Sequence, residues 1–175
     1  MEFQILYALQ ELHMPWLDAL MVFITKLGDD GIFWLILAAV LLLFKKTRKC
    51  GLTILLSMAI SYLLGNMFLK NVIARPRPCT LDPTVPLLIP TPGEYSFPSG
   101  HTLHGFTAAT AIFLHFKKPG IAALVLAALI AFSRMYLFVH FPTDILAGMI
   151  LGIGVAVFVY MIIMKRNKKP AQGMA

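Results

Sequence analysis

A histidine and an aspartate near the end of the chain have the spacing of a catalytic pair. His140 and Asp144 lie four residues apart, so the carboxylate can accept a proton from one imidazole nitrogen and leave the other nitrogen free as a base or nucleophile. Arg134 adds a permanent, forked positive charge that suits a phosphate. The same stretch, taken alone, also fits an ordinary ion pair at a helix end.

A second stretch reads Pro98-Ser99-Gly100-His101 and is typical of a helix start. The free backbone N–H groups and the positive dipole end of a helix form an anion site, and Gly100 lets the backbone approach a ligand closely. Ser99 can donate a hydroxyl hydrogen bond, and His101 can hand a proton to a leaving oxygen. An ordinary N-cap at Ser99 is the alternative interpretation.

A third stretch gathers three cations, Lys70, Arg75 and Arg77, between closely spaced prolines. Prolines hold the guanidinium groups in a rigid presentation, and rigid arginine forks match phosphate oxygens bidentately. The alternative is a basic membrane edge, and the side of the membrane on which the cluster falls decides between the two.

The composition indicates a protein that crosses the membrane several times. Of 175 residues, 59% are hydrophobic and only 13% are charged, which is too apolar for a soluble domain. The net charge of +7 falls in short clusters between apolar runs, so we expect no nucleic-acid partner. Cys50 and Cys79 are expected on opposite sides of the membrane without a disulfide, and we expect no cleavable signal peptide.

The apolar runs predict an all-α integral membrane protein, a single bundle of six transmembrane helices. Residues 1–12 predict a short amphipathic helix that lies at the interface or leads into the first span. Residues 71–98 hold seven of the eleven prolines, which excludes a regular helix and predicts a compact extracytoplasmic loop between the third and fourth spans. The six predicted spans cover about 15–27, 32–44, 52–69, 99–116, 121–138 and 142–164, and 165–175 is the predicted cytoplasmic tail.

The basic residues predict the orientation. Ten of the fifteen Lys and Arg fall in clusters at 45–49, 117–118 and 165–169, all on one side, which should be the cytoplasm. The cations at 70–77 then lie at the opposite mouth, where a basic edge is not expected. The predicted mouth also holds Asp29 and Asp30, interpreted as turn residues, and Glu94, whereas His13 and His115 are expected near cytoplasmic helix ends.

Together these residues predict phosphoryl transfer, which depends on positioning and on charge stabilisation. His140 would attack phosphorus and form a phosphohistidine, Asp144 would orient His140, and His101 would protonate the leaving group and then activate water. We expect neither metal nor cofactor, because the cations and the helix start supply the positive field. The predicted phosphate-binding residues are Lys70, Arg77, Ser99, Gly100 and Arg134, with Arg75 and His104 as supporting candidates.

The three stretches resemble the three-part signature of the type-2 phosphatidic-acid phosphatase superfamily. Lys-x6-Arg-Pro stands at Lys70–Pro78, Pro-Ser-Gly-His at Pro98–His101, and Ser-Arg-x5-His-x3-Asp at Ser133–Asp144, all unsubstituted. The resemblance covers about residues 14–164. It implies a six-span, metal-independent lipid phosphate phosphatase with the roles assigned above, similar to the small bacterial undecaprenyl-diphosphatases and phosphatidylglycerophosphatases.

The main hypothesis is therefore a plasma-membrane phosphatase that converts undecaprenyl diphosphate to the monophosphate at the outer leaflet, with the lipid substrate and membrane lipids as its partners. Phosphatidylglycerophosphate or phosphatidic acid is the alternative substrate. A transporter or channel for phosphorylated lipid or anions would also explain the cations, but it leaves the His140–Asp144 pair and the helix-start His101 without a purpose. A non-catalytic scaffold is a weaker alternative, because all three motifs are intact.

Overall fold

The computed structural model describes residues 1–166, and within them every regular element is helical. The all-α prediction is confirmed, whereas nearly all of the predicted tail at 165–175 lies outside the described residues. Within residues 1–166, three helical stretches are long and apolar enough to cross a membrane: Arg48–Leu81, Lys117–Tyr136 and Pro142–Lys165. The elements are α1 (Glu2–Gln10), α2 (Pro15–Lys26), η1 (Asp29–Gly31), α3 (Ile32–Leu43), α4 (Arg48–Ser61), η2 (Tyr62–Leu69), α5 (Lys70–Ile73), α6 (Pro78–Leu81), α7 (Gly100–His115), α8 (Lys117–Tyr136) and α9 (Pro142–Arg166).

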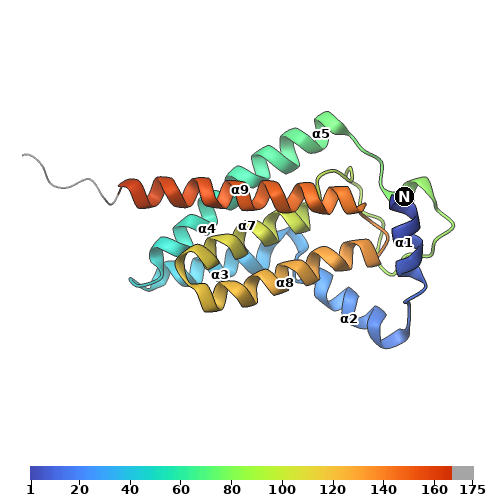
Figure 1. The fold of residues 1–175 in the computed structure, drawn as a ribbon, viewed down its shortest axis with the longest axis horizontal. Helices are drawn as coiled ribbons and strands as arrows, with labels where there is room; N and C mark the ends of the chain where they lie inside the picture. Colours follow the sequence, from blue (N-terminus) through green and yellow to red (C-terminus); the bar gives the residue numbers. More distant parts are fainter. Residues whose placement is uncertain (167–175) are drawn as a thin grey trace, which may run out of the picture.

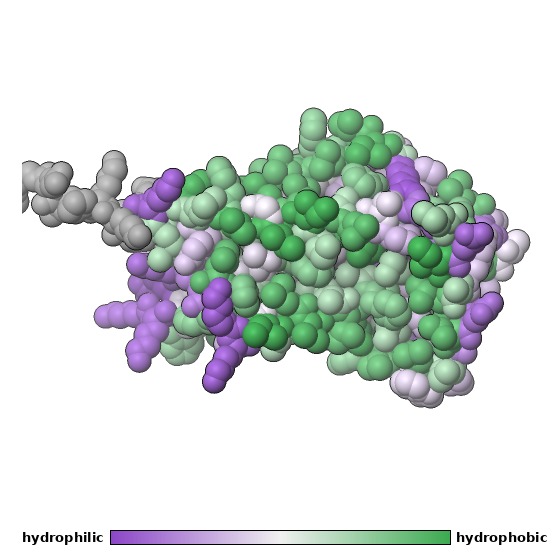
Figure 2. Space-filling view, viewed as in Figure 1, coloured by the Kyte–Doolittle hydropathy of each residue, from purple (hydrophilic) through white to green (hydrophobic). Residues whose placement is uncertain are grey.

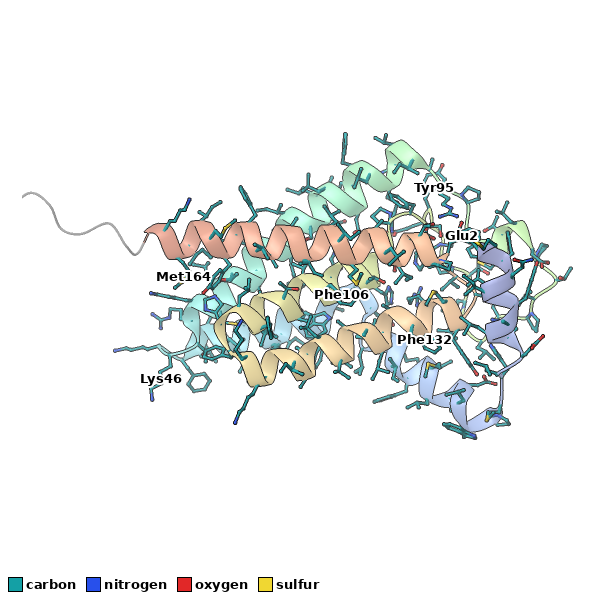
Figure 3. All side chains as sticks on the ribbon, in the orientation of Figure 1. Glu2, Lys46, Tyr95, Phe106, Phe132 and Met164 are labelled. Carbon is teal, nitrogen blue, oxygen red and sulfur yellow. The ribbon has the colours of Figure 1, made fainter. Side chains whose placement is uncertain are left out.

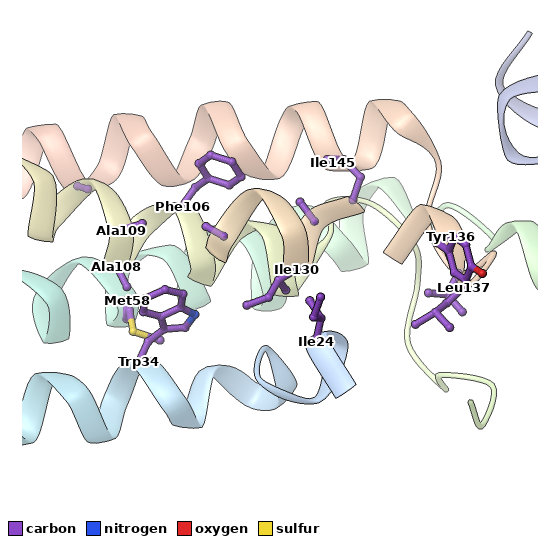
Figure 4. Close-up of a cluster of buried hydrophobic side chains, with 14 of the residues drawn as sticks. Ile24, Trp34, Met58, Phe106, Ala108, Ala109, Ile130, Tyr136, Leu137 and Ile145 are labelled. Atoms are coloured by element: carbon purple, nitrogen blue, oxygen red, sulfur yellow. The ribbon is translucent and has the colours of Figure 1, made fainter. Parts of the chain in front are cut away.

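Helix α7 lies at the centre of the bundle, packed against α4, α8 and α9 (Figure 1). Its neighbours come close because small residues face them: Ala108 and Ala109 are fully buried, and a Cβ added at Gly152 of α9 would lie 2.7 Å from the Leu103 carbonyl oxygen. Such close backbone approach is how helices pack where surrounding lipid is as apolar as their side chains. The buried Trp34 of α3 packs beside Met58 in the same core (Figure 4).

Helices α2 and α3 follow one another in the same general direction through the bundle (Figure 1), instead of forming two antiparallel spans. At α2, Asp18 accepts a hydrogen bond from the Tyr136 hydroxyl, while Trp34 of α3 lies beside Gly105, further along α7. The turn at η1 bends the chain through left-handed residues, Asp30 at φ 50° and Gly31 at φ 68°, without reversing it. Each helix has only 12 residues, about 18 Å, which is short of a membrane core. The predicted six-span count is therefore not confirmed.

The N-terminal helix α1 is separate from α2 and lies across one end of the bundle (Figure 1). Leu6 is fully buried, and the Phe3 ring lies edge-on to Phe141. Just beyond α1, the His13 ring stacks on Tyr136 at the end of α8. The prediction that His13 lies at the same end as the basic clusters is thus wrong, because the chain enters the bundle from the end that holds the 71–98 loop.

The helix from Arg48 to Ile73 is continuous but changes type along its length. Residues Tyr62–Leu69 form the π-helix η2 between α4 and α5. A π-helical segment is rare and is frequently found at functional sites. The chain leaves α5 at Ala74, whose left-handed φ of 47° begins the Pro-rich loop.

Hydrophilic residues gather at the two ends of the bundle, with an apolar belt between them (Figure 2). We call the end formed by 45–49 and 117–118 the basic end, and the end formed by 74–99 and 137–141 the mouth end. Figure 3 shows Lys46 at the basic end and Glu2 and Tyr95 at the other. His115 lies toward the basic end, where its Nε2 is 2.9 Å from Thr53 Oγ1.

Candidate active site

A cavity of about 470 Å³ at the mouth end brings the three motifs together. The motifs are distant in sequence, but the ends of α5, α7 and α8 converge there. This convergence is what a single phosphoryl-transfer site requires. The predicted residues that line the cavity are Lys70, Arg77, Gly100, His101, Arg134 and His140, together with the supporting candidate His104.

His140 lies in the short connection between α8 and α9 and is 2% exposed. Its Nε2 is 3.0 Å from the Arg77 guanidinium, while its Nδ1 is 3.3 Å from Ser96 Oγ and 3.6 Å from Asp144 Oδ2. Burial lowers the pKa of His140 to about 3, although Asp144 acts in the opposite direction. The imidazole is therefore neutral at neutral pH.

Asp144 is fully buried and held by more partners than the four-residue spacing suggested. Its Oδ2 accepts hydrogen bonds from Ser96 Oγ at 2.6 Å and from the Phe141 amide at 2.8 Å, and its Oδ1 accepts one from Arg75 at 2.7 Å. Ser96 thus bridges Asp144 and His140. Sequence reasoning missed Ser96, because no spacing rule relates a residue of the Pro-rich loop to a histidine 44 positions later.

Arg75 contacts the site residue Asp144 but does not line the cavity. Besides Asp144 it contacts the Glu2 carboxylate of α1 at 2.6 Å, and its guanidinium lies 4.0 Å from the centre of the Phe141 ring. Glu2 also accepts hydrogen bonds from Thr143. The pKa of Glu2 is lowered, because the Thr143 and Arg75 hydrogen bonds outweigh the opposing effect of burial. Helix α1 is thereby connected to Asp144 through one arginine.

His101 has a carboxylate partner that the sequence did not indicate. Its Nε2 lies 2.9 Å from Asp29 Oδ1, across 72 positions of sequence. Asp29 was interpreted as a turn residue, and it does stand in the η1 turn. The bend between α2 and α3 presents its side chain to α7, so the turn also supplies a partner for the second histidine.

Ser99 and Gly100 have different places at the start of α7. Ser99 is fully buried, its Oγ accepts a hydrogen bond from the Thr102 amide, and its own amide donates to the Asp144 carbonyl oxygen. It is thus the N-cap of α7, the alternative left open by the sequence, and the cavity wall does not include it. Gly100 lines the cavity, where a Cβ would lie 3.2 Å from Asn66 Nδ2.

Three cationic side chains reach the cavity and are nearly buried, with 4–5% of each exposed. Lys70 forms a salt bridge with Glu94, a loop residue whose pKa is lowered mainly by that hydrogen bond. Arg77 donates to the backbone carbonyls of Glu94 and Val139, and Arg134 donates to Thr25. Within residues 1–166, Arg134 Nε has no hydrogen-bond partner. The cavity therefore offers a positive field for an oxyanion.

The cavity holds the parts of a phosphoryl-transfer enzyme: a buried neutral histidine, a second histidine paired with a carboxylate, and a cationic wall. The chain belongs to the PAP2 superfamily, whose model matches residues 51–168, more than half of its length. The cationic and histidine residues that carry the resemblance in the sequence line this cavity: Lys70, Arg77, His101, Arg134 and His140.

Relatives of known class support this assignment. The chain is 41% identical over 137 residues to the undecaprenyl-diphosphatase of Sulfolobus acidocaldarius, covering 78% of this chain and 66% of that protein. It is 36% identical over 156 residues to phosphatidylglycerophosphatase B of Bacillus subtilis, covering 81% and 73%. Its fold matches the crystal structure of a PAP2-type phosphatidylglycerolphosphate phosphatase from Bacillus subtilis with a TM-score of 0.78 at 32% identity, over 95% of this chain and 86% of that one. These relatives are lipid phosphate hydrolases, and the chain is of the same class.

Proposed function

We propose that this protein hydrolyses an isoprenyl diphosphate, undecaprenyl diphosphate, to the monophosphate through a phosphohistidine on His140. The observation that carries the proposal is the position of His140. It is buried and neutral, with Nδ1 toward Ser96 and Asp144 and Nε2 toward Arg77 and the cavity. The resemblance to the Sulfolobus acidocaldarius undecaprenyl-diphosphatase supports the choice of substrate.

In the first step the Nε2 lone pair of His140 attacks the distal phosphorus. The N–P bond forms and the bond from phosphorus to the bridging oxygen breaks, while His101 donates a proton to the departing lipid monophosphate. Asp144 and Ser96 stabilise the positive charge that develops on His140. Arg77, which contacts Nε2 in the free protein, must turn its N–H to a phosphoryl oxygen as the substrate enters.

In the second step water replaces His140 on phosphorus. His101, which has lost its proton, accepts one from the attacking water, the N–P bond breaks, and inorganic phosphate leaves. Lys70, Arg77, Arg134 and the Gly100 amide bind the equatorial oxygens in both steps. Metal-independent chemistry remains a prediction. Within residues 1–166 no group of three or more His, Cys, Asp or Glu is arranged to hold a metal ion.

Phosphatidylglycerophosphate is the second candidate substrate, with phosphatidic acid as its simpler relative. It is favoured by the resemblance to phosphatidylglycerophosphatase B and to the crystal structure named above. The reaction at phosphorus is the same for these lipids, because only the leaving group differs.

The proposed orientation places the mouth end outside the cell and the basic end in the cytoplasm, following the bias of Lys and Arg toward the cytoplasm. An accessibility tag at the C-terminus tests it. The tag should be labelled only after the membrane is permeabilised, and labelling in intact cells would contradict the orientation.

A phosphate-release assay with the purified protein tests the function. We expect release from undecaprenyl diphosphate, and radioactive phosphate trapped on His140 when labelled substrate is quenched in alkali. Release from only the glycerolipids would contradict the diphosphatase assignment. Transport of labelled lipid that persists in His140→Ala would instead favour a transporter.

A further inference from the structure

The cavity is also lined by polar side chains that the proposed phosphoryl-transfer steps do not use. His104 lines it, is 6% exposed, and has no hydrogen-bond partner for Nε2 within residues 1–166. Asn66 of the π-helix lines the same wall, and its Oδ1 is also buried and unpaired in the described chain. Leaving a buried polar atom without a hydrogen-bond partner destabilises the folded protein by about 1–3 kcal/mol. Two such atoms in one cavity therefore point to a ligand that binds there.

His104 lies further into the bundle than His101, whereas Asn66 lies beside Gly100 at the start of α7. Helix α7 begins at the mouth end with Gly100, and His104 is three residues after His101, about 4.5 Å along the helix axis. The Tyr62 ring, one turn before Asn66, lies 6.3 Å from the His104 ring in a stacked arrangement. The unpaired His104 nitrogen thus lies on the membrane side of His101, and the Tyr62 ring connects it to the helix that carries Asn66.

The in-line geometry of phosphoryl transfer indicates which part of the substrate would lie near His104 and Asn66. The nucleophile His140 and the leaving oxygen stand on opposite sides of phosphorus, so the leaving group extends from the proton donor His101 toward the lipid tail. We propose that His104 and Asn66 form a subsite for the leaving group of the reaction, and that it binds the oxygens of a second phosphate, the one that stays on the lipid. This inference rests on the proposed function and names the class of substrate for that same site.

The chemistry of this wall fits such a group. A neutral imidazole offers one N–H and a carboxamide offers two, so both can donate to phosphate oxygens once the amide is turned. Lys70 lines the same cavity, and its partner Glu94 stands on a loop with its side chain 66% exposed, so a second phosphate can replace that carboxylate. Asp30 also lines the cavity, and it would favour a hydroxyl donor such as glycerol. The test must therefore separate these two leaving groups.

Two matched pairs of substrates make that separation. Farnesyl diphosphate and farnesyl monophosphate differ only in the second phosphate. Phosphatidylglycerophosphate has one phosphoglycerol unit more than phosphatidic acid, so its leaving group carries a glycerol hydroxyl next to the reacting phosphate. We expect the purified wild type to prefer the diphosphate in the first pair. In His104→Ala, kcat/KM for farnesyl diphosphate should fall about 10- to 100-fold with the monophosphate unchanged, the effect of hydrogen bonds to a charged group. His104→Gln, which retains a donor, should keep part of the preference.

Ser57→Ala is the matched control, because Ser57 Oγ is also buried and unpaired within the described residues but does not line the cavity. It should leave both rates unchanged. Equal losses on both farnesyl substrates in His104→Ala, or no loss on either, would overturn the inference. So would a loss confined to the phosphatidylglycerophosphate preference, which would assign the subsite to a phosphatidylglycerol leaving group. No release from any of the four lipids by the wild type would refute the proposed function itself.

Discussion

Two of the three histidines that line the cavity, His140 and His101, have carboxylate partners of opposite kinds. The His140–Asp144 pair is local in sequence and enclosed, with side-chain exposures of 2% and 0%. The His101–Asp29 pair joins two distant helical segments, and its exposures are 18% and 57%. The proposed nucleophile His140 is thus kept from water, whereas the partner of the proposed proton donor His101 can be reached by water.

The difference shows how the two pairs should respond to mutation. Asp144 also anchors Arg75, Ser96 and the Phe141 amide, so it serves both the site and the packing of the mouth end. Within residues 1–166 the Asp29 side chain makes one hydrogen bond, to His101, so we expect Asp29 to serve the site alone. Measurements of both activity and thermal stability can therefore tell the two pairs apart.

The largest effect should follow removal of the nucleophile. In His140→Ala we expect phosphate release to fall by about 10⁴-fold or more and the trapped phosphate label to disappear, because no attacking nitrogen remains. His115→Ala is a control, since His115 stands on α7 toward the basic end beside Thr53. A trapped label that persists in His140→Ala would assign the nucleophile to another residue.

Asp144→Asn should lower both the activity and the thermal stability. We expect kcat to fall by about 10²- to 10⁴-fold, because the charge that forms on His140 loses its counter-ion. Arg75 loses an ionised partner as well, so the free energy of unfolding should fall by roughly 2–4 kcal/mol, seen as a lower melting temperature in detergent. An unchanged melting temperature would contradict the claim that Asp144 also stabilises the mouth end.

Asp29→Asn should affect activity alone. We expect a fall of about tenfold in kcat, since His101 loses its positioning partner, with KM nearly unchanged. Stability should change by less than about 1 kcal/mol, because an exposed ion pair contributes little. Asp82→Asn is a matched control at the mouth end, where Asp82 binds the exposed Tyr7 hydroxyl. Equal kcat values for the two variants would show that Asp29 is a turn residue only.

The smallest effect concerns Glu94, the partner of Lys70. In Glu94→Gln we expect KM to fall about threefold near neutral pH, because the ammonium is free to bind substrate. The Lys70 hydrogen bond holds the pKa of Glu94 below its ordinary value, so the wild type keeps this carboxylate ionised from pH 8 down to 5. The difference between variant and wild type should stay constant over that range and shrink only in more acidic buffer. A difference that already shrinks between pH 7 and 6 would assign the effect to another group.

The sequence alone was sufficient for the all-α class, the family and most of the cavity residues. Apolar runs and proline density reflect local physics, since a segment of sufficient length must satisfy its own backbone in lipid and proline cannot continue a helix. The histidine, arginine and lysine positions followed from motif spacing. The path of 15–43 was not predictable in this way, because the angle at Gly28–Gly31 depends on what the two short helices pack against.

Only the tertiary structure decided which partner each polar group has. Asp29 with His101, Ser96 between His140 and Asp144, and the N-cap role of Ser99 all depend on segments brought together by helix packing. Periodicity describes which face of one helix is buried, but a hydrogen bond between helices also requires their rotation and depth relative to each other. Those quantities are set by the close fit of residues such as Gly152 and Ala108 in the core, and they are absent from the pattern of any single segment.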